Sequence, residues 1–286
     1  MSMSSLYWKE KEMKEKNSRH LLVHIILLAG SLIMILPFAW MVLTAFKTQN
    51  EAIHVPPIIF PSHWDLETFK NVFDKLPFLS AYKNTIISAV VTVVAQLFMC
   101  SMAGYAFGCI KFPGRNVIFV ICLSVLMIPS TLFILPQYLM IQKMGLLNTI
   151  PALFLPNLFS AYGTFLMRQF FMSLPKELED AAKLDGCNYF QIFYKIMLPL
   201  VKPGLITLAI ITVRLAWNDL MWPLVVNPST SKTTLAAALA NLQGQYSTDY
   251  PTMMAGSVMA ILPLVIMFAV FQKQFIEGIA FTGTKA

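Results

Sequence analysis

Residues 174–199 read LPKELEDAAKLDGCNYFQIFYKIMLP, a charged stretch in a chain that is otherwise mostly apolar. Pro175 suits a first helical position, and the acidic residues after it favour the positive end of a helix. Gly186 stands where a left-handed residue commonly ends a helix. Asn188, with Gln191 three residues later, forms the capping-box pattern that opens a second helix. The stretch therefore predicts a helix, a glycine turn and a second helix, all lying outside the bilayer.

The first of these two helices is predicted to have a flank of small residues. Ala181 and Ala182 leave its backbone nearly bare on one side. Side chains of another protein could approach that backbone closely, so we expect a helix that fills a socket on a partner.

The spacing of this stretch resembles a known family. Asp-Ala-Ala, three residues, Gly, nine residues, Ile, one residue and Leu-Pro match the EAA loop of binding-protein-dependent ABC importer permeases, with Asp180 where the family usually has Glu. We call residues 168–199 the EAA loop. The resemblance implies that this loop docks on an ATPase and couples it to transport. The coupling residues that it implies are Glu177, Glu179, Asp180, Ala181, Ala182, Asp185, Gly186, Ile196, Leu198 and Pro199.

The composition is that of an integral membrane protein. Of the 286 residues, 57% are hydrophobic and 12% are charged, whereas soluble domains are about 45–50% apolar and about 25% charged. The net charge of +7 does not indicate nucleic acid, because the basic residues form no stripe with interleaved aromatic residues. The four cysteines lack metal or disulfide spacing. No catalytic motif is present, so we expect no enzyme activity and no cofactor of the chain's own.

Six segments are predicted to span the bilayer, which needs about 20 apolar residues per helix. They are 21–46, 84–110, 116–140, 150–167, 200–226 and 253–275. A signal peptide has an apolar region of about 7–15 residues. The first segment is longer, so we expect that it is not cleaved and remains as a span. The fold class is therefore an all-α integral membrane protein with six transmembrane helices, and the resemblance implies the type I ABC importer permease fold.

The distribution of lysine and arginine orients these spans. One side holds 14 of them and the other holds 6, so the first side is predicted to be cytoplasmic by the positive-inside rule. The richer side has Lys9, Lys11, Lys14, Lys16, Arg19, Lys111, Arg115, Arg168, Lys176, Lys183, Lys195, Lys202, Lys273 and Lys285. The predicted domains are a cytoplasmic N-terminal segment (1–20), a permease domain (21–275) and a cytoplasmic C-terminal tail (276–286). The EAA loop then lies on the side where ATP is.

Span 200–226 contains charged residues that are candidates for a transport pathway. A charge at mid-membrane costs about 2.5–3.5 kcal/mol on insertion scales, so Arg214 and Asp219 are expected to face protein or a water-filled path. Five residues correspond to about 140° around a helix, so the two should not pair. The pathway candidates are Arg214, Trp217, Asn218 and Asp219, with Asn218 the best sugar contact. A structural role stays open, and Trp217 and Trp222 also suit the headgroup belt.

Two further stretches indicate close helix packing and a resemblance to the same family. Gly104 and Gly108 form a small-residue face that lets helices approach closely. The sequence FPGR at 112–115 places Pro and Gly as in a type II turn. Together with AGYA at 103–106, it resembles the sugar-transporting branch of the same permeases.

The predicted outer loop 227–252 is a candidate contact for a solute-binding protein. In maltose-transporting relatives the corresponding region reaches into the docked binding protein, so the resemblance implies a contact through Gln243, Gly244, Gln245 and Tyr246. A passive loop is the alternative.

The function predicted from these features is a permease subunit of an ATP-driven importer for a carbohydrate, and this subunit forms half of the translocation pathway. An oligosaccharide is the first choice of solute, and a monosaccharide or glycerol phosphate is the alternative. The chain resembles the shorter permease subunit of maltose transporters, located in the cytoplasmic (inner) membrane of a bacterium. The implied partners are a second permease subunit in a heterodimer, an ABC ATPase dimer that binds the ATP, an extracytoplasmic solute-binding protein, the carbohydrate and the lipid bilayer. Two alternatives are a self-contained secondary transporter or channel, and a membrane-embedded assembly or sensor subunit.

Overall fold

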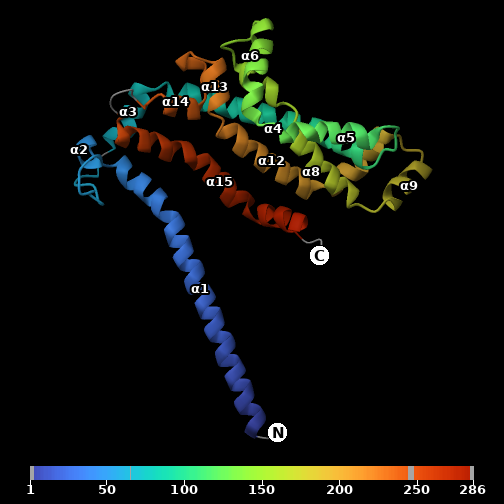
Figure 1. Cartoon of the computed structure of the whole chain (residues 1–286), viewed down its shortest axis with the longest axis horizontal. Coiled ribbons are helices and arrows are strands. Elements are labelled where there is room, and N and C mark those ends of the chain that lie inside the picture. Colours follow the sequence, from blue (N-terminus) through green and yellow to red (C-terminus); the bar gives the residue numbers. More distant parts are fainter. Residues whose placement is uncertain (1–2, 65, 244–247, 284–286) are drawn as a thin grey trace. The chain divides into compact units, whose positions relative to one another are not determined.

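The computed structural model describes residues 3–64, 66–243 and 248–283, and these residues form helices and loops without a β-strand (Figure 1). The long helices are α1 (Met3–Ala45), α4 (Phe78–Gly108), α12 (Lys202–Trp217) and α15 (Tyr250–Gly283). The shorter helices are α2 (Gln49–Ala52), α3 (Glu67–Lys75), α5 (Arg115–Ser124), η1 (Val125–Met127), η2 (Ser130–Phe133), α6 (Ile134–Lys143), α7 (Ile150–Phe154), η3 (Leu155–Asn157), α8 (Ala161–Met172), α9 (Glu177–Leu184), α10 (Tyr189–Gln191), η4 (Ile192–Met197), α11 (Leu198–Leu200), α13 (Met221–Val226), η5 (Thr230–Lys232) and α14 (Leu235–Ala240).

Three single helices are long and apolar enough to cross a membrane: Leu22–Ala45, Phe78–Gly108 and Tyr250–Gln272. Three bent pairs also qualify if each is one span, which makes up to six. They are Arg115–Met127 with Ser130–Lys143 at 98°, Ile150–Asn157 with Ala161–Met172 at 48°, and Tyr189–Leu200 with Lys202–Trp217 at 79°. The all-helical membrane fold is confirmed.

Three predicted spans differ from the helices observed. The segment 150–167 is divided into α7 with η3 and the separate helix α8, at an angle of 48°. The segment 116–140 is not one helix, because the chain breaks at Pro129, whose ring cannot continue the hydrogen-bond ladder. The segment 200–226 also stops early, since α12 ends at Trp217 and the short helix α13 follows after a break. Pro129 accounts for the position of the break in 116–140 but not for the size of its bend, and no proline lies between Trp217 and the start of α13.

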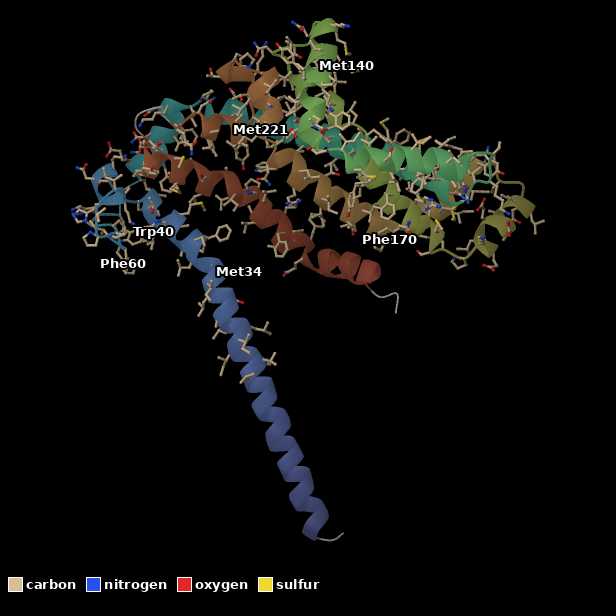
Figure 2. The ribbon with its side chains drawn as sticks, in the orientation of Figure 1. Met34, Trp40, Phe60, Met140, Phe170 and Met221 are labelled. Atoms are coloured by element: carbon tan, nitrogen blue, oxygen red, sulfur yellow. The ribbon has the colours of Figure 1, made fainter. Side chains whose placement is uncertain are left out.

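The chain divides into two compact units, which are described separately. The first comprises the described residues of Met1–Val72 and Tyr246–Val258. Apolar side chains stand out around α1 near Met34, which is 77% exposed (Figure 2). Phe46 packs on the rings of Trp64 and Phe69, with centroids 5.2 and 5.3 Å away. The sequence predicts Asp65 as the residue that caps a helix in this loop, and Asp65 lies outside the described residues.

The loop after α1 is tied together by one carboxylate. Glu51 accepts hydrogen bonds from the hydroxyl and the backbone N–H of Ser62 and from the backbone N–H of Thr48. These donors, with the Ser62 hydroxyl first, lower the pKa of Glu51 to about 2. At neutral pH the Glu51 carboxylate is therefore ionised and links Thr48 to Ser62.

The second unit comprises the described residues of Phe73–Gln245 and Met259–Ala286. Its core is made by α4, which packs along α8 and α12 (Figure 1). A Cβ added at Gly104 would lie 2.7 Å from Met167 Cβ and 2.8 Å from the Arg168 backbone N, and one at Gly108 would lie 3.4 Å from Phe171 Cβ. The small-residue face of α4 is confirmed as the contact with α8.

Candidate coupling and pathway sites

The EAA loop folds as the predicted helix, turn and helix. Helix α9 begins at Glu177, two residues after the expected first position, and the Pro175 carbonyl accepts from the Leu178 N–H at 3.4 Å. The turn at Gly186 is left-handed, with φ of 80°. The Gly186 and Cys187 N–H groups donate to the carbonyls of residues 183 and 182, both at 3.0 Å, which is the Schellman pattern.

The second helix of the loop begins at the predicted capping box. The Asn188 side chain accepts from the Gln191 N–H at 2.9 Å, and Gln191 accepts from the Asn188 N–H at 2.8 Å. The helix then continues as a π-helical segment, Ile192–Met197. Such segments are rare and are found mainly as single turns inserted in α-helices, often at functional sites.

One face of α9 is turned into the chain's own core, which corrects part of the expectation. Ala182 is 3% exposed and Glu179 is 7% exposed, so neither is bare to a partner. Glu179 forms an ion pair with Lys183 at 2.8 Å, and this hydrogen bond raises the pKa of the Lys183 ammonium. Only Ala181 of the two alanines is exposed. A helix rotates by about 100° per residue, so adjacent alanines cannot both lie on one narrow face.

The outward face of α9 contains the other family positions and a residue that the sequence did not single out. Asp180, Ala181, Asp185 and Gly186 are exposed, together with Glu177. Leu184, at the end of the helix, has an apolar side chain that is 90% exposed. Its signal in the sequence was a leucine two residues before the glycine, on a helix predicted to dock on a partner.

The EAA loop is joined to the membrane helices by aromatic rings. Tyr105 on α4 packs on Phe171 of α8 and on Phe193 of η4, with ring centroids 5.6 and 5.4 Å apart. Ile196 and Leu198 pack against the same cluster, while Pro199 is exposed. Displacement of the loop would therefore be transmitted to α4 and α8 through close-packed side chains.

A pocket of about 720 Å³ opens between α4, α6, α8, α12 and α13. This volume lies within the range of about 300–1,000 Å³ that ligand sites have. Three of the four predicted pathway residues line it: Arg214, Asn218 and Asp219. Its other polar lining residues are Thr92, Gln96, Ser130, Thr131, Gln137, Asn157, Ser160, Tyr162 and Thr212.

Trp217 does not line this pocket, and both tryptophans are buried within the chain. Trp217 is 8% exposed, donates from Nε1 to the Ala260 carbonyl at 3.1 Å and packs edge-on against Tyr82. Trp222 lines the pocket but is only 5% exposed, and its Nε1 donates to the Ala152 carbonyl at 2.8 Å. The helix break after Trp217 directs the two rings into the protein, which spacing along one continuous helix could not indicate.

The pocket also contains a polar group that the sequence analysis missed. Gln96 on α4 donates from Nε2 to the Asn157 carbonyl at 2.7 Å and accepts from the Thr212 hydroxyl at 2.8 Å. It therefore links α4, η3 and α12. The available signal was an amide in an otherwise apolar span, where polar groups are costly and tend to be functional.

The remaining predicted residues are less informative. Arg214 and Asp219 form no ion pair with each other, as their spacing indicated; Asn218 donates to the Arg214 carbonyl at 2.9 Å. Gln243 is exposed. Gly244, Gln245 and Tyr246 lie outside the described residues.

Comparison with known proteins agrees with this geometry. The family described as "Binding-protein-dependent transport system inner membrane component" matches residues 101–279. The arabinooligosaccharides transport system permease protein AraQ of Halalkalibacterium halodurans is 38% identical over 256 residues, covering 88% of this chain and 92% of the relative. The diacetylchitobiose uptake system permease protein NgcG of Streptomyces coelicolor is 30% identical over 265 residues, covering 91% and 87%.

A solved structure has the same fold. One chain in the crystal structure of a bacterial ABC transporter involved in the import of the acidic polysaccharide alginate matches with a TM-score of 0.78. The sequence identity is 23%, and the match covers 96% of this chain and 99% of that one. At this identity the likeness establishes the fold.

The helical fold and the EAA loop define a permease subunit of a transport complex. The chain belongs to the binding-protein-dependent transport system inner membrane component family, the permeases of ABC importers. This is a transport family and not an enzyme family, and its importers work with an ATPase and a solute-binding protein. The membership confirms the resemblance and sets aside the self-contained transporter and the sensor subunit.

Proposed function

We propose that the chain forms half of the translocation pathway for a carbohydrate, with an oligosaccharide as the solute class. The observation that carries this proposal is the lining of the 720 Å³ pocket. Its polar lining consists mostly of amide and hydroxyl side chains, and these alternate with apolar side chains and with the rings of Tyr162 and Trp222. Among the described residues that line it, only Arg214 and Asp219 are charged, and they have opposite signs, so the pocket suits a neutral solute rich in hydroxyl groups. The sugars named for the relatives support the same class.

The proposed topology has six spans, with both termini in the cytoplasm of a bacterial-type inner membrane. It is supported by the excess of lysine and arginine on the side of the EAA loop. The proposed domains are the N-terminal segment 1–20, the permease domain 21–275 and the tail 276–286. The other half of the pathway would come from a second, non-identical permease.

The proposed coupling element is the EAA loop. Its exposed residues, centred on Asp180, Ala181, Leu184 and Asp185, would insert into a groove of the ATPase. Closure of the ATPase dimer would then move the loop and, through Tyr105, the helices α4 and α8. The spans would turn from inward-open to outward-open. Residues 243–246 are the proposed contact for the solute-binding protein on the other side.

The pathway proposal is tested by Gln137→Leu on α6. We expect uptake to fall at least tenfold, because an amide that lines the pocket is replaced by a side chain without hydrogen-bonding groups. The binding protein should still stimulate ATP hydrolysis, since the EAA loop is unchanged. The measurement is uptake of radiolabelled oligosaccharide into proteoliposomes containing the whole importer, beside its ATPase rate.

A matched control is available on the same helix. Gln142→Leu makes the identical change five residues later, at an exposed position outside the pocket. Uptake by this variant should equal that of the wild type. Equal uptake by the Gln137→Leu variant would contradict the pathway assignment.

The coupling proposal is tested by Leu184→Asp. Burial of a leucine side chain in a groove contributes about 1.5–3 kcal/mol, so a charge there should lower recovery of the ATPase at least tenfold. The measurement is a pull-down of the tagged chain from native membranes in detergent, with quantification of the ATPase and the second permease.

The conservative variant Leu184→Met should retain the ATPase, because it keeps an apolar side chain of similar volume. The second permease should accompany all three proteins, which separates lost docking from lost folding. Undiminished recovery of the ATPase with Leu184→Asp would rule out this face of α9 as the docking surface.

A further inference from the structure

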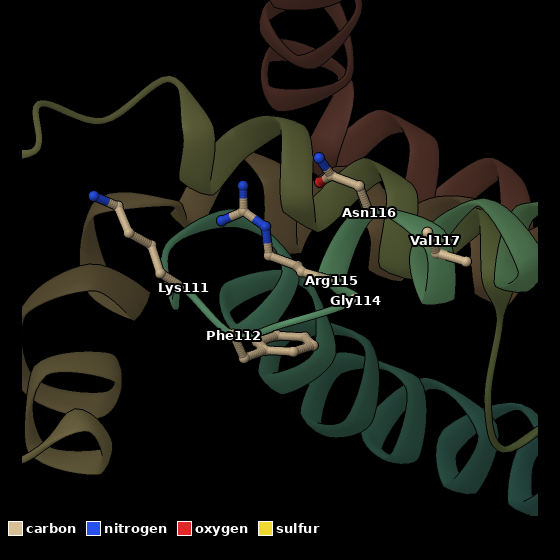
Figure 3. Close-up of a pocket in the computed structure, with 6 residues that line it drawn as sticks. All are labelled: Lys111, Phe112, Gly114, Arg115, Asn116 and Val117. Atoms are coloured by element: carbon tan, nitrogen blue, oxygen red, sulfur yellow. The ribbon is translucent and has the colours of Figure 1, made fainter.

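The turn between α4 and α5 contains an open pocket that the transport proposal does not use. Its volume is about 380 Å³, and it is lined by Lys111, Phe112, Gly114, Arg115, Asn116 and Val117. Figure 3 shows the polar ends of Lys111, Arg115 and Asn116 on one side of the turn and the Phe112 ring on the other. The side with the polar groups is therefore cationic.

The backbone holds this arrangement in place. Gly114 has φ of 77° and ψ of −1°, as the third residue of the predicted type II turn requires, and the Arg115 N–H donates to the Phe112 carbonyl at 3.4 Å. Arg115 Nη1 donates to the Ile110 carbonyl at 3.2 Å, which fixes the guanidinium across the turn. Helix α5 starts at Arg115 without a side-chain cap, so its first N–H groups add partial positive charge.

A third cation is held on the same side of α5. The Arg168 guanidinium lies 4.2 Å from the centroid of the Phe119 ring, and its Nε donates to the Phe107 carbonyl at 3.0 Å. Phe119 is four residues after Arg115, so both lie on one face of α5. Within the part of the chain that the structure describes, none of Lys111, Arg115 and Arg168 forms an ion pair with a carboxylate. Among the described residues, these three cations therefore have no carboxylate as a direct partner.

An apolar surface continues directly from the cationic pocket along α5. Val117 is 64% exposed, and one turn further Val120 and Ile121 are 63% and 62% exposed. A free phosphate ion would use the cations and leave this surface uncovered. A ligand that is anionic at one end and hydrocarbon at the other would use both.

We propose that this turn is a binding site for one anionic phospholipid at the cytoplasmic surface of the membrane. Lys111 and Arg115 contact the phosphate diester, Asn116 donates to the polar headgroup, and an acyl chain lies along Val117, Val120 and Ile121. Basic pockets beside membrane helices on the cytoplasmic side are the usual receptors for such headgroups. The site is separate from the solute pocket, so it does not depend on which solute is transported.

The test is lipid retention by the assembled importer in detergent, measured by native mass spectrometry during titration with phosphatidylglycerol or phosphatidylethanolamine. The wild type should bind one phosphatidylglycerol in preference to phosphatidylethanolamine. Each basic residue near an anionic headgroup contributes about fivefold in affinity, so Lys111→Gln combined with Arg115→Gln should weaken binding by about 30-fold. Addition of inorganic phosphate should not displace the lipid, because phosphate lacks the acyl chain.

A second variant and a control keep the test decisive. Asn116→Asp adds a negative charge to the pocket without touching the Arg115 bond to Ile110, and it should also weaken binding. Lys202→Gln removes an exposed cation on the same predicted side and should change nothing. A photo-crosslinking residue at position 120 should capture lipid.

Four results would overturn the proposal. They are wild-type affinity in both pocket variants, equal binding of phosphatidylethanolamine, displacement of the lipid by phosphate, and capture of the second permease at position 120.

Discussion

Replacement of Gly104 by alanine is expected to destabilise the permease by about 1–3 kcal/mol, the usual cost of overpacking a well-packed contact. The added Cβ would lie 2.7 Å from Met167 Cβ and 2.8 Å from the Arg168 backbone N. Neither atom is the end of a flexible side chain, so α4 and α8 would have to separate. Association of membrane helices depends on such close approach, because lipid is as apolar as the side chains that it would replace.

The same glycine-to-alanine substitution should not destabilise the permease at two other positions, Gly30 and Gly108. Alanine is favoured over glycine in a helix interior by about 1 kcal/mol. A Cβ at Gly30 meets nothing within 4 Å, and one at Gly108 makes an ordinary contact at 3.4 Å. Gly30→Ala, in the interior of α1, should therefore be neutral or stabilising, and Gly108→Ala, at the last residue of α4, should be neutral. The measurement is the thermal unfolding midpoint of each purified variant in one detergent. A midpoint for Gly104→Ala as high as for these controls would show that α4 and α8 do not pack this closely.

The features that sequence predicted correctly depend on local chemistry. The left-handed turn at Gly186, the capping box at Asn188 and the turn at Gly114 each require particular residues within four positions. The small-residue face at Gly104 was also predictable, because a close contact between helices requires small residues in a span. The family resemblance then allowed the fold and a transport function to be predicted from these local features.

The features that sequence did not predict depend on how helices are placed. Pro129 indicates a kink, but the 98° bend depends on packing that a hydropathy pattern does not contain. Ala182 and Glu179 were expected to face a partner because nothing in the sequence tells which side of α9 meets Tyr105. The pocket residues Gln96 and Gln137 come from different helices. Their convergence is visible only once those helices are packed.

Replacement of Gly186 by valine is expected to leave the permease folded and to abolish coupled transport. A Cβ at this position meets nothing within 4 Å, so no clash is created. The backbone, however, has φ of 80°, a conformation that costs a residue with a Cβ about 1–2 kcal/mol. Unwinding of the turn would relieve this strain, and it would break the hydrogen bonds to the carbonyls of residues 182 and 183. Helix α9 would then lose its fixed angle to the helix that follows.

Graded substitution separates backbone conformation from side-chain bulk at this position. Asparagine tolerates the left-handed region far better than a β-branched residue and is also much larger than alanine. If the conformation matters, uptake should fall in the order glycine, asparagine, alanine, valine, with the valine variant at least tenfold below wild type. If bulk matters because the ATPase packs on this glycine, the alanine variant should transport better than the asparagine variant. Uptake and ATP hydrolysis by reconstituted importer distinguish the two, and wild-type uptake by Gly186→Val would remove the turn from the coupling mechanism. Because an added Cβ has open space around it within this chain, any preference for small size must come from a partner, so the order of the variants also reports whether the ATPase reaches the turn.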